Sequence, residues 1–123
     1  MTQHIPRTVT VPVLVTKPLE IEEPDWCTGR HSDQAEYKAD LTHYGPEHTL
    51  GPEGFGLFRA MLAQTPFTER GPHTVQLYVE QQELNGAYSP DEVEELADAL
   101  VEAAARLRSL GRELTAILAR GDR

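Results

Sequence analysis

The chain has 123 residues, of which 39% are hydrophobic, and its 11 basic and 20 acidic residues give a formal net charge of -9. This length suits one domain with a core large enough to fold without a disulfide or a metal ion. The acid excess, with no cluster of basic residues in the first 100, argues against direct binding to nucleic acid or to an anionic membrane.

The single cysteine, Cys27, excludes an internal disulfide and fits a reducing cytoplasm. The N-terminal apolar stretch is too short and too interrupted for a signal peptide, and no run approaches the 18 apolar residues of a membrane span. We therefore expect a cytoplasmic protein with a disordered tail at residues 1–7, one domain at 8–119 and a second tail at 120–123.

In chain order, the first predicted element is a strand at Thr8–Val15, because four valines alternate there with polar residues or proline: Val9, Val11, Val13 and Val15. Pro12 would place this strand at a sheet edge or give it a bulge.

A short strand is predicted over Tyr37–Tyr44, followed by turns at the breakers "GPEH" and "GPEG". The apolar stretch Phe55–Gln64 fits a buried strand or a short helix, and we favour the strand. Alternation of Val75, Leu77 and Val79 predicts another strand, which we expect at the centre of the sheet.

The last third predicts a helix over residues 90–119. Ser89 is a good N-cap, Pro90 suits the first helical position, and Glu92 completes a capping box. Acids in the first turns and arginines later match the helix dipole. The chain therefore predicts an α+β fold: a small, mostly antiparallel sheet of four or five strands with one long amphipathic helix across it.

The helix carries a heptad-like apolar stripe, with steps of three and four residues: Val93, Leu96, Leu100, Ala103, Leu107, Leu110, Leu114 and Ile117. This stripe could simply cover the sheet. However, a helix of about 30 residues spans about 45 Å, more than twice the length of a typical strand. We expect its C-terminal half to extend past the sheet and to bind a protein partner or a second copy through Leu110 and Leu114.

A candidate metal site begins at "PDWCTGRH" and continues at "HYGPEH". Cys27, His31, His43 and His48 have the spacing C-x3-H-x11-H-x4-H, and ligands three to five residues apart suit a tetrahedral zinc ion. Without His48, the fourth ligand would be Asp40, Asp33 or a water, and an open site of that kind could activate water for hydrolysis. Alternatively, Cys27 is a small buried residue beside Trp26.

A nucleophilic thiol is a further alternative. Cys27 with His31 or His43, and with Asp40 orienting the histidine, would form such a pair. No oxyanion element is recognisable in the sequence. Spatial adjacency decides between these possibilities.

The order of these segments resembles a family of small uncharacterised actinomycete proteins, known as a domain of unknown function. Its members typically carry W-C-x-x-x-H, a later H-x-G and a final helix of the type LADALxxAAxRLRxL. The matching positions are Trp26, Cys27, His31, His43 and Gly45, within residues 8–119. The resemblance implies the order of elements and an actinomycete origin, but it implies no activity.

We expect a non-enzymatic accessory or regulatory interaction protein with a small structural zinc site. A metal-dependent hydrolase using the same cysteine and histidines is the first alternative. A metal-free dimerisation module is the second.

Overall fold

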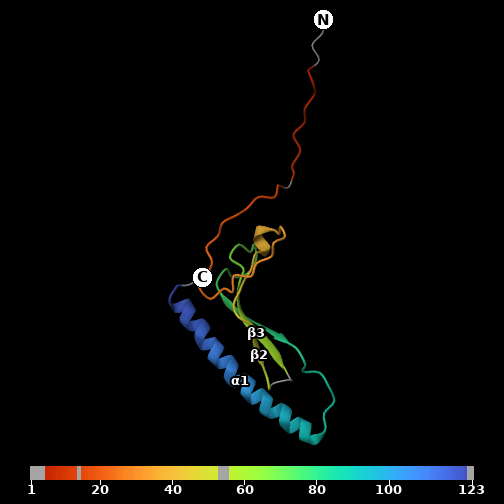
Figure 1. Ribbon diagram of the computed structural model, residues 1–123, viewed down its shortest axis with the longest axis vertical. Helices are drawn as coiled ribbons and strands as arrows, with labels where there is room; N and C mark the ends of the chain where they lie inside the picture. The colour runs from red at the N-terminus through yellow and green to blue at the C-terminus, as the bar shows by residue number, and fades with distance from the viewer. Residues whose placement is uncertain (1–4, 14, 53–55, 122–123) are drawn as a thin grey trace.

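The computed structural model describes residues 5–13, 15–52 and 56–121. It has an α+β fold in which one long helix packs on a four-stranded antiparallel sheet (Figure 1). The fold class predicted from the sequence is confirmed, including the number of strands. Within these described ranges, no helix is long and apolar enough to cross a membrane.

The sheet is built around β3 (Phe58–Gln64). β4 (Gln76–Gln81) pairs along one side of it, whereas β1 (His43–Tyr44) and β2 (His48–Leu50) pair with its two ends on the other side. All three pairings are antiparallel. The N–H and C=O groups of alternate residues of β3 point to opposite sides, so this strand can form hydrogen bonds with neighbours on both.

The prediction of the central strand is wrong: β3 lies at the centre of the sheet, and β4, the strand expected there, lies at an edge. β3 is apolar at five of its seven positions and buried at four, because strands pair along both of its sides and α1 packs on one of its faces. β4 alternates because it lies at an edge and is largely exposed. The strand predicted at Phe55–Gln64 is confirmed over 58–64, and Phe55 lies outside the described residues.

The predicted N-terminal strand is wrong for the residues that the structure describes. Residues 8–13 and Val15 form no strand, and the valines at the alternating positions are 60–83% exposed. Leu14, like residues 1–4 of the predicted tail, lies outside the described part of the chain. Alternation suits an extended backbone, but a strand is stabilised by a paired neighbour and a surface to cover, and this segment has neither.

The strand predicted over residues 37–44 is reduced to its last two residues. A 3-10 turn at Lys38–Asp40 precedes it, because the Asp40 N–H donates to the Tyr37 carbonyl and the Leu41 N–H to the Lys38 carbonyl. β2 begins within the predicted turn "GPEH", at His48. β1 and β2 therefore run in the same direction along one side of β3, and the chain folds back once, between β2 and β3.

The helix prediction is confirmed at both ends, since α1 spans Pro90–Ala119. The Ser89 side chain accepts a hydrogen bond from the Glu92 N–H, and the Glu92 carboxylate accepts one from the Ser89 N–H. This reciprocal capping box satisfies two backbone donors that would otherwise lack partners at the start of the helix.

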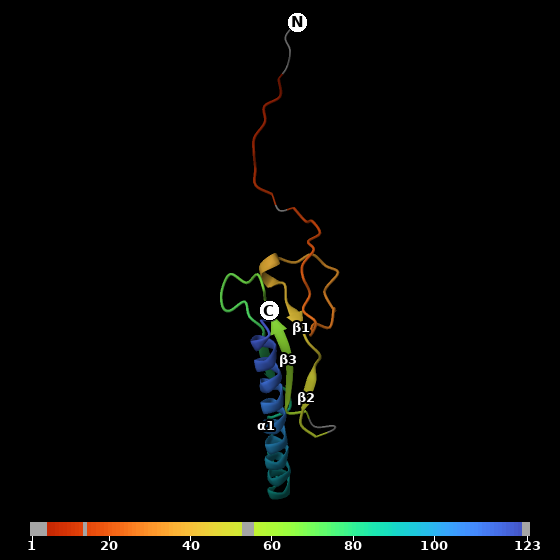
Figure 2. The ribbon, with the colours of Figure 1, turned by 90° about the vertical axis from the view of Figure 1, so that its left-hand side faces the viewer.

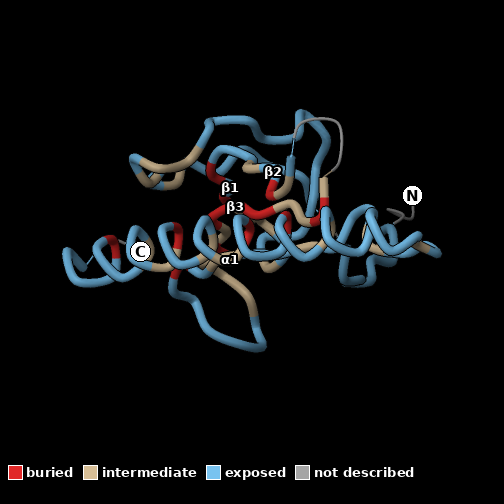
Figure 3. The backbone as a smooth tube through the Cα atoms, turned by 90° about the horizontal axis from the view of Figure 1, so that it is seen from below, coloured by how far each residue is buried: buried red, intermediate tan, exposed pale blue. Residues whose placement is uncertain are grey.

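Packing of α1 on the sheet reverses the predicted overhang. Leu110 and Ile117, in the C-terminal half, are 7% and 3% exposed and pack in clusters with residues of the sheet. The first turns extend past the sheet instead (Figure 2), and Val93 there is 48% exposed. Figure 3 shows the buried residues along the strands and at intervals along one side of α1. The later turns of the helix therefore cover the sheet, through Ala103, Leu110 and Ile117.

Candidate metal centre

A tight turn begins the segment that carries the candidate ligands. The Cys27 N–H donates to the Pro24 carbonyl at 3.0 Å, which closes the turn, and the Thr28 N–H donates to the Tyr44 carbonyl at 2.9 Å. The second bond ties the segment to β1. Gly29 has a φ of 77°, a conformation that side chains other than glycine rarely adopt. This bend returns the chain so that His31 faces Cys27.

Close packing brings the same segment onto the sheet at Gly45. A Cβ atom at this position would lie 3.2 Å from the Leu62 Cβ and 3.4 Å from the Trp26 carbonyl oxygen. The Gly45 N–H also donates to the Leu62 carbonyl. Absence of a side chain at Gly45 therefore lets the Trp26–Cys27 backbone approach β1 and β3.

Four potential ligands meet at this junction: Glu23, Cys27, His31 and His43. One ligand atom from each lies within 4.8 Å of all the others, so the group could hold a metal ion. His43 projects from β1 and is 2% exposed, whereas Glu23 and His31 lie nearer the solvent.

The shorter distances define the centre of the group. The Cys27 thiol donates to Glu23 Oε1 at 3.1 Å and lies 3.7 Å from His31 Nε2, and His31 Nε2 lies 2.8 Å from the same carboxylate oxygen. The His31 and His43 rings meet edge to face with centroids 5.3 Å apart. Three donor atoms are therefore already in mutual contact, with an imidazole beside them.

The protonation states in this group follow from burial and from the neighbouring side chains. Burial raises the pKa of the Cys27 thiol, although a hydrogen bond from the Gly29 N–H opposes this shift. Hydrogen bonds from Cys27 and then His31 hold the pKa of Glu23 below its usual range. Burial, with the nearby His31, lowers the pKa of His43. In the absence of a metal, the group therefore contains a neutral thiol, a carboxylate and a neutral His43 imidazole at pH 7.

Two buried polar atoms at the site lack a hydrogen-bond partner within the described residues, the Nδ1 of His43 and the Nε1 of Trp26. The Trp26 ring packs edge to face on His43 at 6.3 Å between centroids. Buried polar atoms normally have partners, because an unpaired one costs about 1–3 kcal/mol. The orphaned imidazole nitrogen is thus an observation that a bound ligand would explain.

The sequence brought together three of these four residues. His48 is not in the group: it lies on β2 and lines a cavity of about 300 Å³ that Trp26 and Cys27 also line. Asp33 and Asp40, considered as replacements, are also outside it. Glu23 takes that position, and in the sequence it stands in an acidic run with Glu20, Glu22 and Asp25. The spacing E-x3-C-x3-H, from Glu23 to His31, was the signal that could have identified it.

The nucleophilic-thiol alternative is disfavoured by this geometry. Activation of a thiol requires a base that takes its proton and an environment that lowers its pKa. Cys27 instead donates to a carboxylate, and its pKa is raised. Asp40, the proposed orienting residue, belongs to the 3-10 turn and is not in the group.

Comparison with known proteins identifies the family. A family model described as "Domain of unknown function (DUF6907)" matches residues 8–116, so the chain belongs to this family. The match includes the ligand group, the whole sheet and most of α1. No match was found among curated proteins or among solved structures.

Proposed function

We propose that this chain is a non-enzymatic accessory domain that binds one zinc ion through Glu23, Cys27, His31 and His43. The observation that carries the proposal is the convergence of four donor atoms within 4.8 Å. Thiolate, imidazole and carboxylate are the three donor types that zinc accepts in proteins, and four of them complete its tetrahedron.

The spacing of the donors supports zinc. With Zn–S of about 2.3 Å and Zn–N or Zn–O of about 2.0–2.1 Å, a tetrahedron has donor-to-donor edges of about 3.3–3.6 Å. The separations among Cys27, His31 and Glu23 are 2.8, 3.1 and 3.7 Å. Changes of less than 1 Å would bring these three donors to the spacing of a coordination shell, and the His43 donor lies within 4.8 Å of each of them.

The surroundings also suit a bound cation. The thiol would lose its proton on binding, and the Gly29 N–H already points at the sulfur, where it would stabilise the thiolate. The thiolate and the Glu23 carboxylate together would balance the charge of the ion. A neutral, buried His43 keeps a lone pair available, since its pKa is lowered.

A structural role follows from where the ligands lie. Glu23, Cys27 and His31 come from a segment without regular secondary structure, whereas His43 belongs to β1. Zinc would fix this segment to the sheet at a point where only a few backbone hydrogen bonds do so. Four protein ligands close the coordination sphere, which favours a structural site over a catalytic one.

The cellular setting is also proposed. A lone cysteine that serves as a ligand needs a reducing compartment, which supports a cytoplasmic location. The resemblance noted from the sequence supports an actinomycete origin. An accessory or regulatory role with a protein partner fits a small acidic domain with a closed metal site.

A zinc-dependent hydrolase is the second candidate, because a cavity of about 850 Å³ adjoins the ligand group and is lined by Glu23, His43 and His73 among others. In that case Glu23 would act as a base instead of a ligand. Zinc held by the three remaining residues would supply an activated water.

Elemental analysis of the purified, untagged protein tests the proposal. We expect close to one zinc per chain, lost in Cys27→Ala and reduced in Glu23→Gln, and retained in the matched control His48→Gln. Zinc retained at full affinity in Glu23→Gln, together with hydrolytic activity that this variant lacks, would favour the hydrolase. Absence of bound zinc after growth and titration with zinc would refute both metal functions.

A further inference from the structure

An extended N-terminal arm, here residues 5–13 and 15–18, projects from the body of the molecule (Figures 1 and 2). Its valines are among the most exposed large apolar residues of the chain, between 60% and 83%. The match to the family model begins at residue 8, so these valines belong to the shared domain. An exposed segment with the alternation of a strand lacks the sheet that it is suited to join.

The body has an open sheet edge of matching length. β4, Gln76–Gln81, pairs with β3 on one side, and within the described residues nothing pairs with its other side. The Gln82 N–H donates to the Leu57 carbonyl, and antiparallel pairing alternates, so the backbone groups of Val79 and Gln81 point away from β3. An open edge of this kind is a template for one more strand.

The open edge adjoins an apolar surface. Val79 lies opposite Ala60, on the face that α1 covers, and is nevertheless 43% exposed. Leu100 precedes the buried Ala103 by three residues and so lies roughly 60° round the helix from it. Leu107 and Leu114 have the same relation to Leu110 and Ile117.

Part of this apolar surface is open to solvent. Leu100 is 38% exposed, as Val79 is at 43%. Alternating valines added beside β4 would cover Val79, because it lies on the outermost strand of the sheet.

We infer that the arm of one copy adds as a strand to the open edge of β4 in a second copy, and that two chains exchange arms reciprocally. The arm leaves the body at the end opposite the first turns of α1 and points away from its own β4 (Figure 1), so a straight arm reaches a sheet edge of another molecule. Two exchanged strands double the buried surface toward the roughly 1,600 Å² typical of a stable complex.

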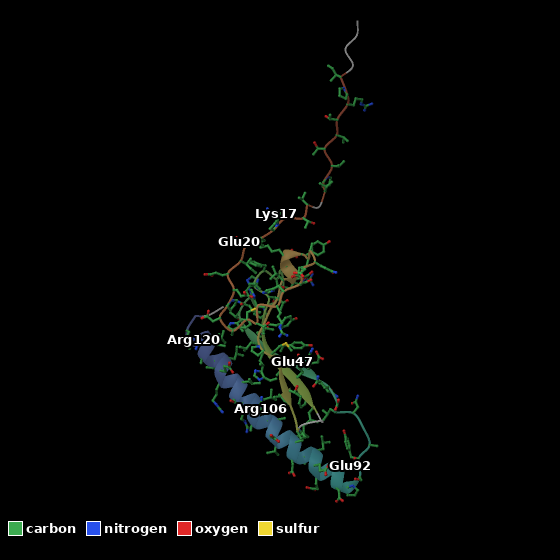
Figure 4. The ribbon with its side chains drawn as sticks, in the orientation of Figure 1. Lys17, Glu20, Glu47, Glu92, Arg106 and Arg120 are labelled. Carbon is green, nitrogen blue, oxygen red and sulfur yellow. The ribbon has the colours of Figure 1, made fainter. Side chains whose placement is uncertain are left out.

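The position of Pro12 and the charges of the arm agree with this arrangement. Backbone groups alternate along a strand, so pairing through Val9, Val11 and Val13 leaves the missing N–H of Pro12 on the outer side, where an edge strand tolerates proline. The arm carries two basic residues and no acid, Arg7 and Lys17, in a chain of net charge -9. Lys17 lies near the base of the arm, close to Glu20 (Figure 4). The arm is thus suited to an acidic body.

Sedimentation velocity on the full chain tests the exchange. We expect a concentration-dependent dimer whose dissociation constant rises at least tenfold in Val11→Asp, because a charge would enter the apolar face. The matched control Thr10→Asp places the same charge on the other face of the arm and keeps the dimer. A wild-type chain that stays monomeric up to several hundred micromolar, or a dimer unaffected by Val11→Asp, would overturn the inference.

A complementation experiment identifies the two surfaces. Val79→Pro removes an outward N–H of β4 and should abolish the dimer, whereas Val79→Thr keeps that N–H and should preserve it. Mixing Val11→Asp with Val79→Pro joins one intact arm to one intact edge, so the mixture should form a heterodimer although each variant alone is monomeric. Circular dichroism checks that each variant is folded. Arm amides protected from hydrogen exchange in a monomer would show that the arm binds its own β4, and would contradict exchange between copies.

Discussion

Replacement of His43 by leucine should destabilise the fold in zinc but not in its absence. His43 is 2% exposed, its Nδ1 has no partner within the described residues, and its ring contacts those of Trp26 and His31. Without metal, removing a buried unpaired polar atom recovers about 1–3 kcal/mol, and losing the two ring contacts costs about 1–3 kcal/mol. The two changes cancel, so without zinc the variant should have about the same free energy of unfolding as the wild type.

In zinc, His43→Leu should be less stable than the wild type. A ligand present at 100 times its dissociation constant stabilises the folded state by about 2.7 kcal/mol. The wild-type chain would gain this amount, whereas His43→Leu would lose most of it because one ligand is missing. The free energies of unfolding should therefore differ by about 2–3 kcal/mol more in zinc than in chelator.

Urea unfolding followed by circular dichroism, in chelator and in excess zinc, measures both quantities. His48→Leu is the matched control and should show no zinc-dependent difference, since His48 lies outside the ligand group. Equal destabilisation of His43→Leu in the two conditions would refute the reasoning. His43 would then be a packing residue.

Three further predictions concern the fold. Leu110→Ala should lower the free energy of unfolding by about 2–5 kcal/mol because Leu110 is buried, whereas Leu100→Ala, at 38% exposure, should lower it by about 1 kcal/mol. Equal losses for the two variants in urea unfolding would contradict the packing of α1. Hydrogen bonds from the Ser89 backbone and side chain hold the pKa of Glu92 below its usual range. The stabilisation is therefore present above the pKa of the unfolded chain and is lost as the pH falls through the lower pKa of the folded chain; Glu92→Gln should flatten this acid limb of the stability profile. Gly29→Ala should destabilise the chain by about 1–2 kcal/mol through its positive φ alone, since no atom lies within 4 Å of the added Cβ; an unchanged melting temperature would mean that the bend is relaxed in solution.

The parts of the fold that were predictable from the sequence are those fixed by local chemistry. The capping box at Ser89 located the start of α1, and the apolar run around β3 identified a buried strand. Strand order was not predictable in the same way. The alternation of Val75, Leu77 and Val79 describes one covered face, which an edge strand and a half-covered central strand share.

The wrong predictions of the N-terminal strand and of the helix overhang arose because each sequence pattern is compatible with two structures. The valines of the arm have the periodicity of a strand, yet within the described part of the chain no strand pairs with them. The heptad stripe of α1 suggested an overhang at the wrong end, because spacing alone does not say which turns meet the sheet. Leu110, one of the two leucines expected to bind a partner, is instead buried against Leu50 and Ala60 of the same domain.

The candidate site was predictable in part for the same reason. Residue type and spacing suggested Cys27, His31 and His43, and the structure places them together. The spacing E-x3-C-x3-H is a signal for Glu23, but only the structure shows that Glu23, unlike the neighbouring acids of its segment, is directed at the thiol beside the Pro24–Cys27 turn. A carboxylate is identified as a ligand by what it faces, and this depends on tertiary structure.

Zinc K-edge X-ray absorption of the zinc-loaded protein tests the proposed ligand set. We expect four-coordinate zinc with one sulfur at about 2.3 Å and three nitrogen or oxygen neighbours at about 2.0–2.1 Å. The sulfur contribution should vanish in Cys27→Ala, and the spectrum of His48→Gln should match the wild type. A shell without sulfur, or one altered by the loss of His48, would contradict the site proposed here.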